Sequence, residues 1–276
     1  MKSIPEAEGR HAFGGNASGY HRSRPDYPAW VFDVLTREGV VGPRTATLEI
    51  GAGSGQATRK LIELGAAPLT LIEPDTRFAS FLDEICATAG PDCRVIYEAL
   101  EEADLTDSAF DLVFLATSFH WLNPQTRVQN LAAATRPGGY VVLVWQVFQD
   151  LYRPDLFHEA TRELLAPLAA SPSGQPDSLP FALDSAARIG EFLGSDLFEL
   201  VLHAESHWAL TLDAAGVRML YEGFSGVSRL ADEPRTRLLD QLEGIARRDF
   251  ADVVTRNITT PLYVFRRAYS RDSDAA

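Results

Sequence analysis

The stretch LEIGAGSGQAT, residues 48–58, decides the fold. An apolar run that carries Glu49 gives way to glycines at positions 51, 53 and 55, and a polar, helix-competent segment follows. A strand that passes through a glycine-rich turn into a helix is a common way to hold a nucleotide, because the turn lets the ligand approach the backbone closely. The segment therefore predicts a nucleotide site. It leaves open which nucleotide binds and whether the chain catalyses a reaction with it.

Strands and helices alternate around this turn from about residue 46 to residue 146. The apolar strands expected in this part lie at 46–50, 69–73, 94–99, 110–117 and 140–145. The expected helices lie at 56–64, around 78–85 and from Asn123-Pro124 to about Arg136. Such alternation predicts a doubly wound α/β fold with a mostly parallel sheet and helices on both faces.

After Gln149 the alternation ends. The expected segments there are helices at 154–168, 213–222 and 235–249, a flexible connection at 171–180, and strands at 197–210 and 261–269. We expect four parts: an N-terminal arm or lid with the first helix at 1–40, the nucleotide-binding core at 41–150, a cap insertion with a sixth strand at 151–230, and the last helix, closing strand and disordered tail at 231–276.

Composition disfavours some classes of function. The 276 residues include 25 basic and 38 acidic side chains, and the resulting net charge of −13 disfavours a nucleic-acid substrate. Neither a secretory signal nor a run of about 18–20 apolar residues is present, so we expect a cytoplasmic protein without a membrane segment. Cys86 and Cys93 lie seven residues apart without a histidine cluster, which favours reduced thiols over a metal site or a disulfide.

The details of the loop favour a single nucleoside over a dinucleotide. A dinucleotide fingerprint places a third glycine where this chain has Gln56. Glu73, 22 residues after Gly51, ends the next strand and can accept hydrogen bonds from both hydroxyls of a ribose. Glu49 would repel a pyrophosphate and suits a ligand with a positive group. An ordinary strand–helix turn is the alternative.

Four segments of the chain resemble the class I S-adenosylmethionine-dependent methyltransferases. In order along the chain, they are LEIGAGSGQAT, LTLIEPD, VIYEALEEADLTDSAFDLVFLATSFHWLNP and LAAATRPGGYVVLVW. Among these methyltransferases, the chain is similar to small-molecule enzymes that carry HW after the fourth strand. HRSRPDYPAW near the N-terminus and PLYVFRRAY, as a closing antiparallel strand, extend the resemblance. It implies a Rossmann-like seven-stranded sheet with a helical cap, and S-adenosylmethionine as the cofactor.

The resemblance also implies roles for individual residues. The implied cofactor-binding residues are Glu49, Gly51, Ala52, Gly53, Gln56, Glu73, Pro74, Ala99, Leu100, Thr117 and Arg24. Those of the loop contact the methionine end, Glu73 binds the ribose, and Pro74 lies against the adenine. Ala99 and Leu100 lie on the other side of the adenine, and Thr117 lies near the sulfonium. The sequence EALEEAD leaves open which residue meets the adenine amino group.

TSFHWL (117–122) lies just past the end of a strand, where ligands of parallel sheets bind. His120 has a pKa suited to a general base, but a wall of the pocket or a structural turn are equal alternatives. Tyr20 is a catalytic candidate in an N-terminal lid that also presents Arg24 to the cofactor carboxylate, with a surface tether as the alternative. Candidate substrate contacts are Trp121, His158 and Tyr221, although most aromatic residues after 147 are expected in the core.

The expected function is transfer of a methyl group to a small, partly apolar molecule at O, N or C, without a metal. The alternatives are a nicotinamide-dependent oxidoreductase, and a protein of the same fold that binds the cofactor without transferring its methyl group. A homo-oligomer is compatible with the sequence.

Overall fold

The computed structural model describes residues 8, 17–168 and 179–269, and its residues separate into two compact units. The sheet unit holds Tyr27–Trp145, Asp184–Ala204 and Pro261–Ala276. The helical unit holds Met1–Asp26, Gln146–Leu183 and Glu205–Thr260. These units do not follow the four-part division expected from the sequence, which stays a prediction.

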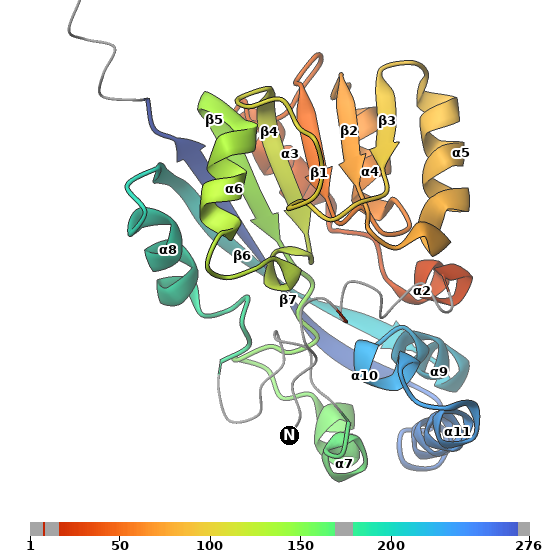
Figure 1. Cartoon of the computed structure of the whole chain (residues 1–276). Coiled ribbons are helices and arrows are strands. Elements are labelled where there is room, and N and C mark those ends of the chain that lie inside the picture. Colours follow the sequence, from red (N-terminus) through yellow and green to blue (C-terminus); the bar gives the residue numbers. More distant parts are fainter. Residues whose placement is uncertain (1–7, 9–16, 169–178, 270–276) are drawn as a thin grey trace, which may run out of the picture. The chain divides into compact units, whose positions relative to one another are not determined.

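A seven-stranded sheet has the order β3-β2-β1-β4-β5-β7-β6 (Figure 1). Its strands are β1 Thr47–Ile50, β2 Leu69–Ile72, β3 Cys93–Ile96, β4 Phe110–Ala116, β5 Thr135–Val144, β6 Phe198–Leu212 and β7 Val254–Arg267. The first five strands pair in parallel, and β7 runs antiparallel to β5. The chain moves outward from β1 to β3 and then returns to β4, so the strand order reverses between β1 and β4. The doubly wound α/β fold is confirmed.

Helices occur in both units. Those of the sheet unit are α3 Ala29–Arg37, α4 Gln56–Glu63, α5 Ala79–Ala89, α6 Arg127–Ala134 and α8 Ser185–Leu193, with short 3-10 turns η2 Thr76–Phe78 and η3 Phe119–Trp121. Those of the helical unit are α2 Ala17–Ser23, α7 Leu156–Leu165, α9 Ala214–Glu222, α10 Ser225–Ser228 and α11 Asp232–Asp249. Figure 1 shows α6 on the near face of the sheet.

The central strands consist mostly of apolar side chains, and the polar side chains of β1 and β2, which are Thr47, Glu49 and Thr70, are buried as well. Every residue of β1 and β2 is buried, which suits parallel strands that helices cover on both sides. The helix α4 turns Ala57, Thr58 and Leu61 toward this core. Its other side carries Lys60 and Glu63, which form an exposed ion pair. The amphipathic helix α4, which follows the glycine loop, therefore packs its apolar side against the core.

Several boundaries differ from the sequence prediction. The helix expected from Asn123 begins at Arg127. The Asn123 side chain accepts a hydrogen bond from the amide of Gln125 at 2.9 Å, which forms a turn before the helix instead of a cap. The helices α2 and α8 were not expected, and β7 begins at Val254, well before residue 261. The flexible connection at 171–180 falls mostly, and the tail from 270 entirely, outside the described residues.

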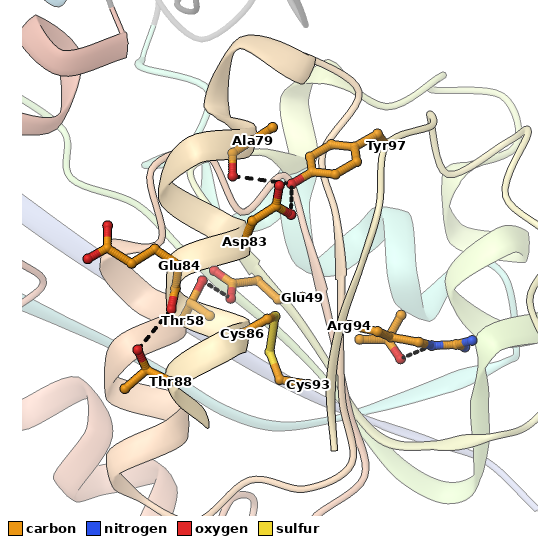
Figure 2. Close-up of a disulfide and its surroundings, with 11 residues drawn as sticks. Glu49, Thr58, Ala79, Asp83, Glu84, Cys86, Thr88, Cys93, Arg94 and Tyr97 are labelled. Atoms are coloured by element: carbon orange, nitrogen blue, oxygen red, sulfur yellow. Dashed lines mark hydrogen bonds between the residues drawn. A yellow bond between two sulfur atoms is a disulfide. The ribbon is translucent and has the colours of Figure 1, made fainter. Parts of the chain in front are cut away.

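The prediction of free thiols is wrong, because Cys86 and Cys93 form a disulfide (Figure 2). Cys86 lies in the last turn of α5 and Cys93 begins β3. The chain turns at Gly90, and the two Cα atoms come within 5.0 Å, a separation that a disulfide spans. The spacing of seven residues between the two cysteines does not by itself indicate this tight turn between α5 and β3. The cytoplasmic prediction therefore loses the support of reduced thiols.

Candidate functional site

The candidate site lies where the strand order reverses, at the carboxyl ends of β1 and β4. In open α/β sheets, ligands bind at this place because the loops from the two strands diverge there. The Ser118 hydroxyl, just after β4, donates a hydrogen bond to the carbonyl oxygen of Ile50 at the end of β1. The amides of Gly51 and Ala52 bond to the carbonyl of Ile72 at 2.8 and 3.2 Å. These contacts fix the start of the loop against its neighbouring strands.

All three glycines of the loop have left-handed backbones, with φ of 75° at Gly51, 56° at Gly53 and 78° at Gly55. A Cβ atom at Gly51 would lie 2.5 Å from the Cβ of Ser118. At Gly55 it would lie 2.2 Å from Cδ1 of Ile85, a residue of α5. The loop therefore requires glycine for its backbone and for its close packing.

Glu73 comes directly after β2 and turns its carboxylate back to the loop. Its two oxygens accept hydrogen bonds from the amides of Gly53 at 2.8 Å and Asp75 at 2.9 Å. Burial raises the pKa of Glu73 to about 7, although both amide bonds favour the charged form. A carboxylate has about four lone-pair positions, so two remain for a ligand.

Glu49 is buried in β1 and shares its carboxyl group with α4. The hydroxyl of Thr58 donates a hydrogen bond to the Glu49 carboxyl at 2.7 Å (Figure 2). Burial raises the pKa of Glu49 to about 8, the Thr58 bond opposes this change, and the nearby charge of Glu73 adds to it. The protein thus holds a neutral acid at pH 7 that would ionise beside a cation.

The remaining residues of the implied nucleoside site follow the ends of β2 and β3. Pro74 follows Glu73 and is half-buried, and Gln56 begins α4. The carbonyl of Ala99 accepts the amides of residues 102 and 103, which closes a turn. Leu100 is buried and lines a surface groove of about 440 Å³. Their roles as ligand contacts stay predictions.

Thr117 has an unusual backbone at the end of β4. Its φ is 57°, a left-handed conformation that is costly for a β-branched residue. Its amide bonds to the carbonyl of Val144 at 2.8 Å, and its hydroxyl lies 2.7 Å from the hydroxyl of Tyr27. Such strain is concentrated at functional sites, where surrounding contacts maintain it.

His120 and Trp121 are buried in the 3-10 turn that follows Thr117. The indole nitrogen of Trp145 lies 3.1 Å from Nδ1 of His120, and the rings of His120 and Trp121 are 4.8 Å apart. Arg127 contacts this turn twice: its guanidinium lies 4.2 Å from the centre of the Phe119 ring, and it donates to the carbonyl of Phe119 at 3.5 Å. Arg127 in turn pairs with Glu191 of α8 at 2.5 Å.

The remaining predicted residues lie in the helical unit. Arg24 donates to the carbonyl of Gly223 at 3.0 Å and stacks over Phe224. The hydroxyl of Tyr221 accepts a hydrogen bond from Arg256 at 2.7 Å inside the core. His158 is exposed on α7. Tyr20 lies in α2, but its side chain is outside the described part of the chain. Their roles toward a ligand stay predictions.

Four residues near the site were missed by the sequence reasoning: Ser118, Tyr27, Trp145 and Arg127. Trp145 follows β5, and His120 follows β4. Because the carboxyl ends of these neighbouring parallel strands lie at the same edge of the sheet, the sequence could have suggested the contact between Trp145 and His120. The Arg127–Glu191 pair joins residues 64 apart, and no local pattern signals it.

A buried ion pair in the helical unit was also missed. Arg256 on β7 donates to the carboxylate of Asp155, the cap of α7, at 2.6 Å. The same guanidinium donates to Tyr221 and to the carbonyl of Phe148 at 3.2 Å. The three partners compensate a charge that would be costly to bury alone, so the burial of Arg256 is explained without a ligand.

Metal-binding and membrane-spanning features bear on the class of site. Among residues 8, 17–168 and 179–269, no group of three or more His, Cys, Asp or Glu side chains could hold a metal ion. Within the same part of the chain, no helix is both long enough and apolar enough to cross a bilayer.

Known proteins similar in sequence include several methyltransferases. Residues 47–139 match the family model of a methyltransferase domain. An uncharacterized methyltransferase of Schizosaccharomyces pombe is 26% identical over 250 residues, which cover 88% of this chain and 92% of that protein. One of Mycobacterium tuberculosis is 32% identical over 134 residues, 49% of this chain and 51% of that protein. The chain thus spans about half the length of the mycobacterial relative.

Solved structures share the fold at low sequence identity. The [4+2]-cyclase SpnF matches with a TM-score of 0.55 and 13% identity, covering 90% of this chain and 85% of that one. Phosphoethanolamine N-methyltransferase 2 of Haemonchus contortus, in complex with S-adenosyl-L-methionine, matches with a TM-score of 0.53 and 14% identity, covering 93% and 57%. At these identities the likeness extends to the fold alone.

Proposed function

We propose that this chain, whose residues 47–139 match the family model of a methyltransferase domain, is a class I S-adenosylmethionine-dependent methyltransferase that moves a methyl group from S-adenosylmethionine to a small, partly apolar metabolite. The acceptor atom is O, N or C, and S-adenosylhomocysteine is the product. The observation that carries the proposal is the pair of buried carboxyl groups, Glu49 and Glu73, on either side of a loop of left-handed glycines.

Glu73 is the proposed ribose ligand. Its two amide hydrogen bonds orient the carboxylate and leave a lone pair on each oxygen. Both hydroxyls of a ribose can donate to these positions, and their bonds would favour the ionised form. The adenine would then be enclosed by Pro74, which follows β2, and by Ala99 and Leu100, which follow β3.

Glu49 is the proposed partner for positive charge at the methionine end. S-adenosylmethionine supplies the methyl group by displacement at a cationic sulfur, and its amino group is a second positive charge. Burial raises the pKa of Glu49 to about 8, so a cation beside the loop would favour the ionised form and be attracted to it, whereas a pyrophosphate would gain no such attraction. Gln56 in place of a third glycine also opposes a dinucleotide. A nicotinamide-dependent oxidoreductase is therefore the weaker candidate.

The acceptor is proposed to be a small molecule. Ligands of open α/β sheets bind at the carboxyl ends of the parallel strands, so the acceptor is proposed to lie near the end of β4, beside Thr117, His120 and Trp121. The acidic balance of the chain, with a net charge of −13, opposes binding of a polyanion such as RNA or DNA.

Thermal unfolding separates the cofactor classes. A ligand that binds only the native state raises the melting temperature by mass action. We expect S-adenosylhomocysteine to raise it and NAD to leave it unchanged. Stabilisation by NAD alone would contradict the proposal.

Transfer activity needs its own test, because a [4+2]-cyclase has the same fold. The whole chain is incubated with S-adenosylmethionine labelled in its methyl group and with a metabolite extract. We expect a labelled small molecule whose formation S-adenosylhomocysteine inhibits. Binding of the cofactor without any labelled product would favour a protein of this fold that does not transfer the methyl group.

Glu73→Ala is expected to weaken binding of S-adenosylhomocysteine by about 1–3 kcal/mol, because the ribose hydroxyls lose a charged acceptor. Isothermal titration calorimetry measures the change, and Glu63→Ala, which removes an exposed carboxylate from α4, is the control. The variant also removes the acceptor of the Gly53 amide. Titration with an analogue that lacks both ribose hydroxyls separates the two effects, since the wild type and Glu73→Ala should then differ much less. An undiminished difference would remove the ribose assignment.

A further inference from the structure

The indole of Trp145 and the imidazole of His120 form a buried hydrogen bond at the end of the sheet. The indole nitrogen lies 3.1 Å from Nδ1 of His120, and both side chains are almost fully buried. An indole N–H can only donate, so Nδ1 must accept and cannot carry a proton. We infer that Trp145 holds His120 as the neutral tautomer protonated at Nε2, so that His120 serves the site as a hydrogen-bond donor and not as a general base.

The indole is held in place from several sides. The rings of Phe119 and Tyr263 meet it edge to face at 6.3 and 6.1 Å. Its backbone amide bonds to the carbonyl of Pro261 on β7 at 3.3 Å. With only 2% of its surface exposed, the ring cannot turn its N–H to solvent without unpacking the core. The donor therefore stays opposite His120.

The imidazole is held as well. His120 is the middle residue of η3, whose first residue, Phe119, contacts Arg127 through its ring and through its carbonyl at 3.5 Å. The bidentate ion pair of Arg127 with Glu191 fixes that guanidinium. A proton on Nδ1 would place two N–H groups face to face in a buried place, which leaves both unsatisfied. The surroundings thus select one tautomer.

This tautomer limits the chemistry of His120. Nδ1 uses its lone pair for the indole, and Nε2 already bears a hydrogen, so neither nitrogen is available to take a proton. The Nε2–H group can donate to a ligand atom with a lone pair and so orient it. The role in methyl transfer rests on the proposed function, whereas the tautomer itself does not. Trp145 is then a positioning residue.

Nitrogen NMR tests the tautomer directly. The whole chain is labelled with ¹⁵N-histidine, and long-range ¹H–¹⁵N correlations distinguish a protonated from an unprotonated ring nitrogen. His120→Gln removes one set of signals and thereby assigns it. We expect an unprotonated Nδ1 and a protonated Nε2 at neutral pH. A proton on Nδ1, whether as the other neutral tautomer or as imidazolium, would overturn the inference, whatever the cofactor proves to be.

Two internal comparisons sharpen the result. His207 lies with Nδ1 3.3 Å from the buried carboxylate of Asp150, so its Nδ1 should be protonated, in contrast to Nδ1 of His120. In Trp145→Phe, the His120 signals should move toward a mixture of tautomers, while those of His207 stay unchanged. An unchanged His120 pattern in that variant would show that Trp145 does not select the tautomer.

The indole proton gives a second measurement. In His120→Phe, the Nε1–H of Trp145 loses its acceptor, and its hydrogen exchange should become roughly three- to tenfold faster. Trp208, whose indole donates to Thr260 at 2.9 Å in the helical unit, should exchange as before. Equal exchange of the Trp145 proton in the wild type and the variant would contradict the hydrogen bond on which the inference depends.

Discussion

Glu49→Gln is expected to stabilise the free protein and to weaken binding of its ligand. The wild type keeps a buried acid whose pKa is raised to about 8, mainly by burial. Glutamine has nearly the same shape and can still accept the hydrogen bond of Thr58. It never has to carry a charge in the core. The variant should therefore lose the cost that the wild type bears in keeping this group neutral.

The size and sign of the effect follow from proton linkage. The unfolded chain releases the proton near pH 4.5, whereas the folded chain keeps it up to about pH 8. Between these values the folded state binds more protons, so the free energy of unfolding of the wild type falls as pH rises. At about 1.4 kcal/mol per pH unit, the advantage of Glu49→Gln should grow by about 3 kcal/mol from pH 4.5 to pH 7.

Urea unfolding followed by tryptophan fluorescence at pH 5, 6, 7 and 8 measures this difference. Glu63→Gln, an exposed acid at the end of α4, should show no comparable growth with pH. A constant difference between Glu49→Gln and the wild type would mean that Glu49 ionises normally in the folded state.

The same variant tests the role of Glu49 toward the ligand. Loss of a charged acceptor should weaken binding of S-adenosylmethionine by about 1.5–3 kcal/mol. Calorimetry on the variant and on Glu63→Gln gives this number. A variant that is more stable and binds equally well would leave Glu49 as a core residue without a ligand.

The fold was predictable because the residues that determine it are close in sequence. Strands of four to ten mostly apolar residues alternate with helices, and the parallel sheet follows from this order. The loop and the two acids Glu49 and Glu73 were found for the same reason, since each directly marks the end of a strand. What a strand end contains can be read from the sequence.

The contacts of these residues could not be read in the same way. The disulfide depends on the angle between α5 and β3, and the Trp145–His120 hydrogen bond depends on how two side chains turn. The sequence favoured reduced thiols and left His120 open between base, wall and structure. Local spacing does not determine three-dimensional packing. This packing forms the disulfide between the two cysteines, and it underlies the tautomer inferred for His120.

Gly51→Ala is expected to lower the free energy of unfolding by about 2–5 kcal/mol. A left-handed backbone costs about 1–2 kcal/mol for alanine. The new Cβ would also lie 2.5 Å from the Cβ of Ser118, and forcing a methyl group into a packed site costs about 1–3 kcal/mol more. Relief of the contact would push Ser118 away from Ile50 and break the hydrogen bond that joins the ends of β4 and β1.

Gly39→Ala separates these two contributions. Gly39 has nearly the same backbone, with φ of 68°, but a Cβ there would meet nothing within 4 Å. Its replacement should therefore cost only the backbone strain of about 1–2 kcal/mol. Urea unfolding of both variants gives the difference, which measures the contact with Ser118. Equal losses would mean that the end of β4 yields without cost, and the loop would then not owe its shape to the junction between β1 and β4.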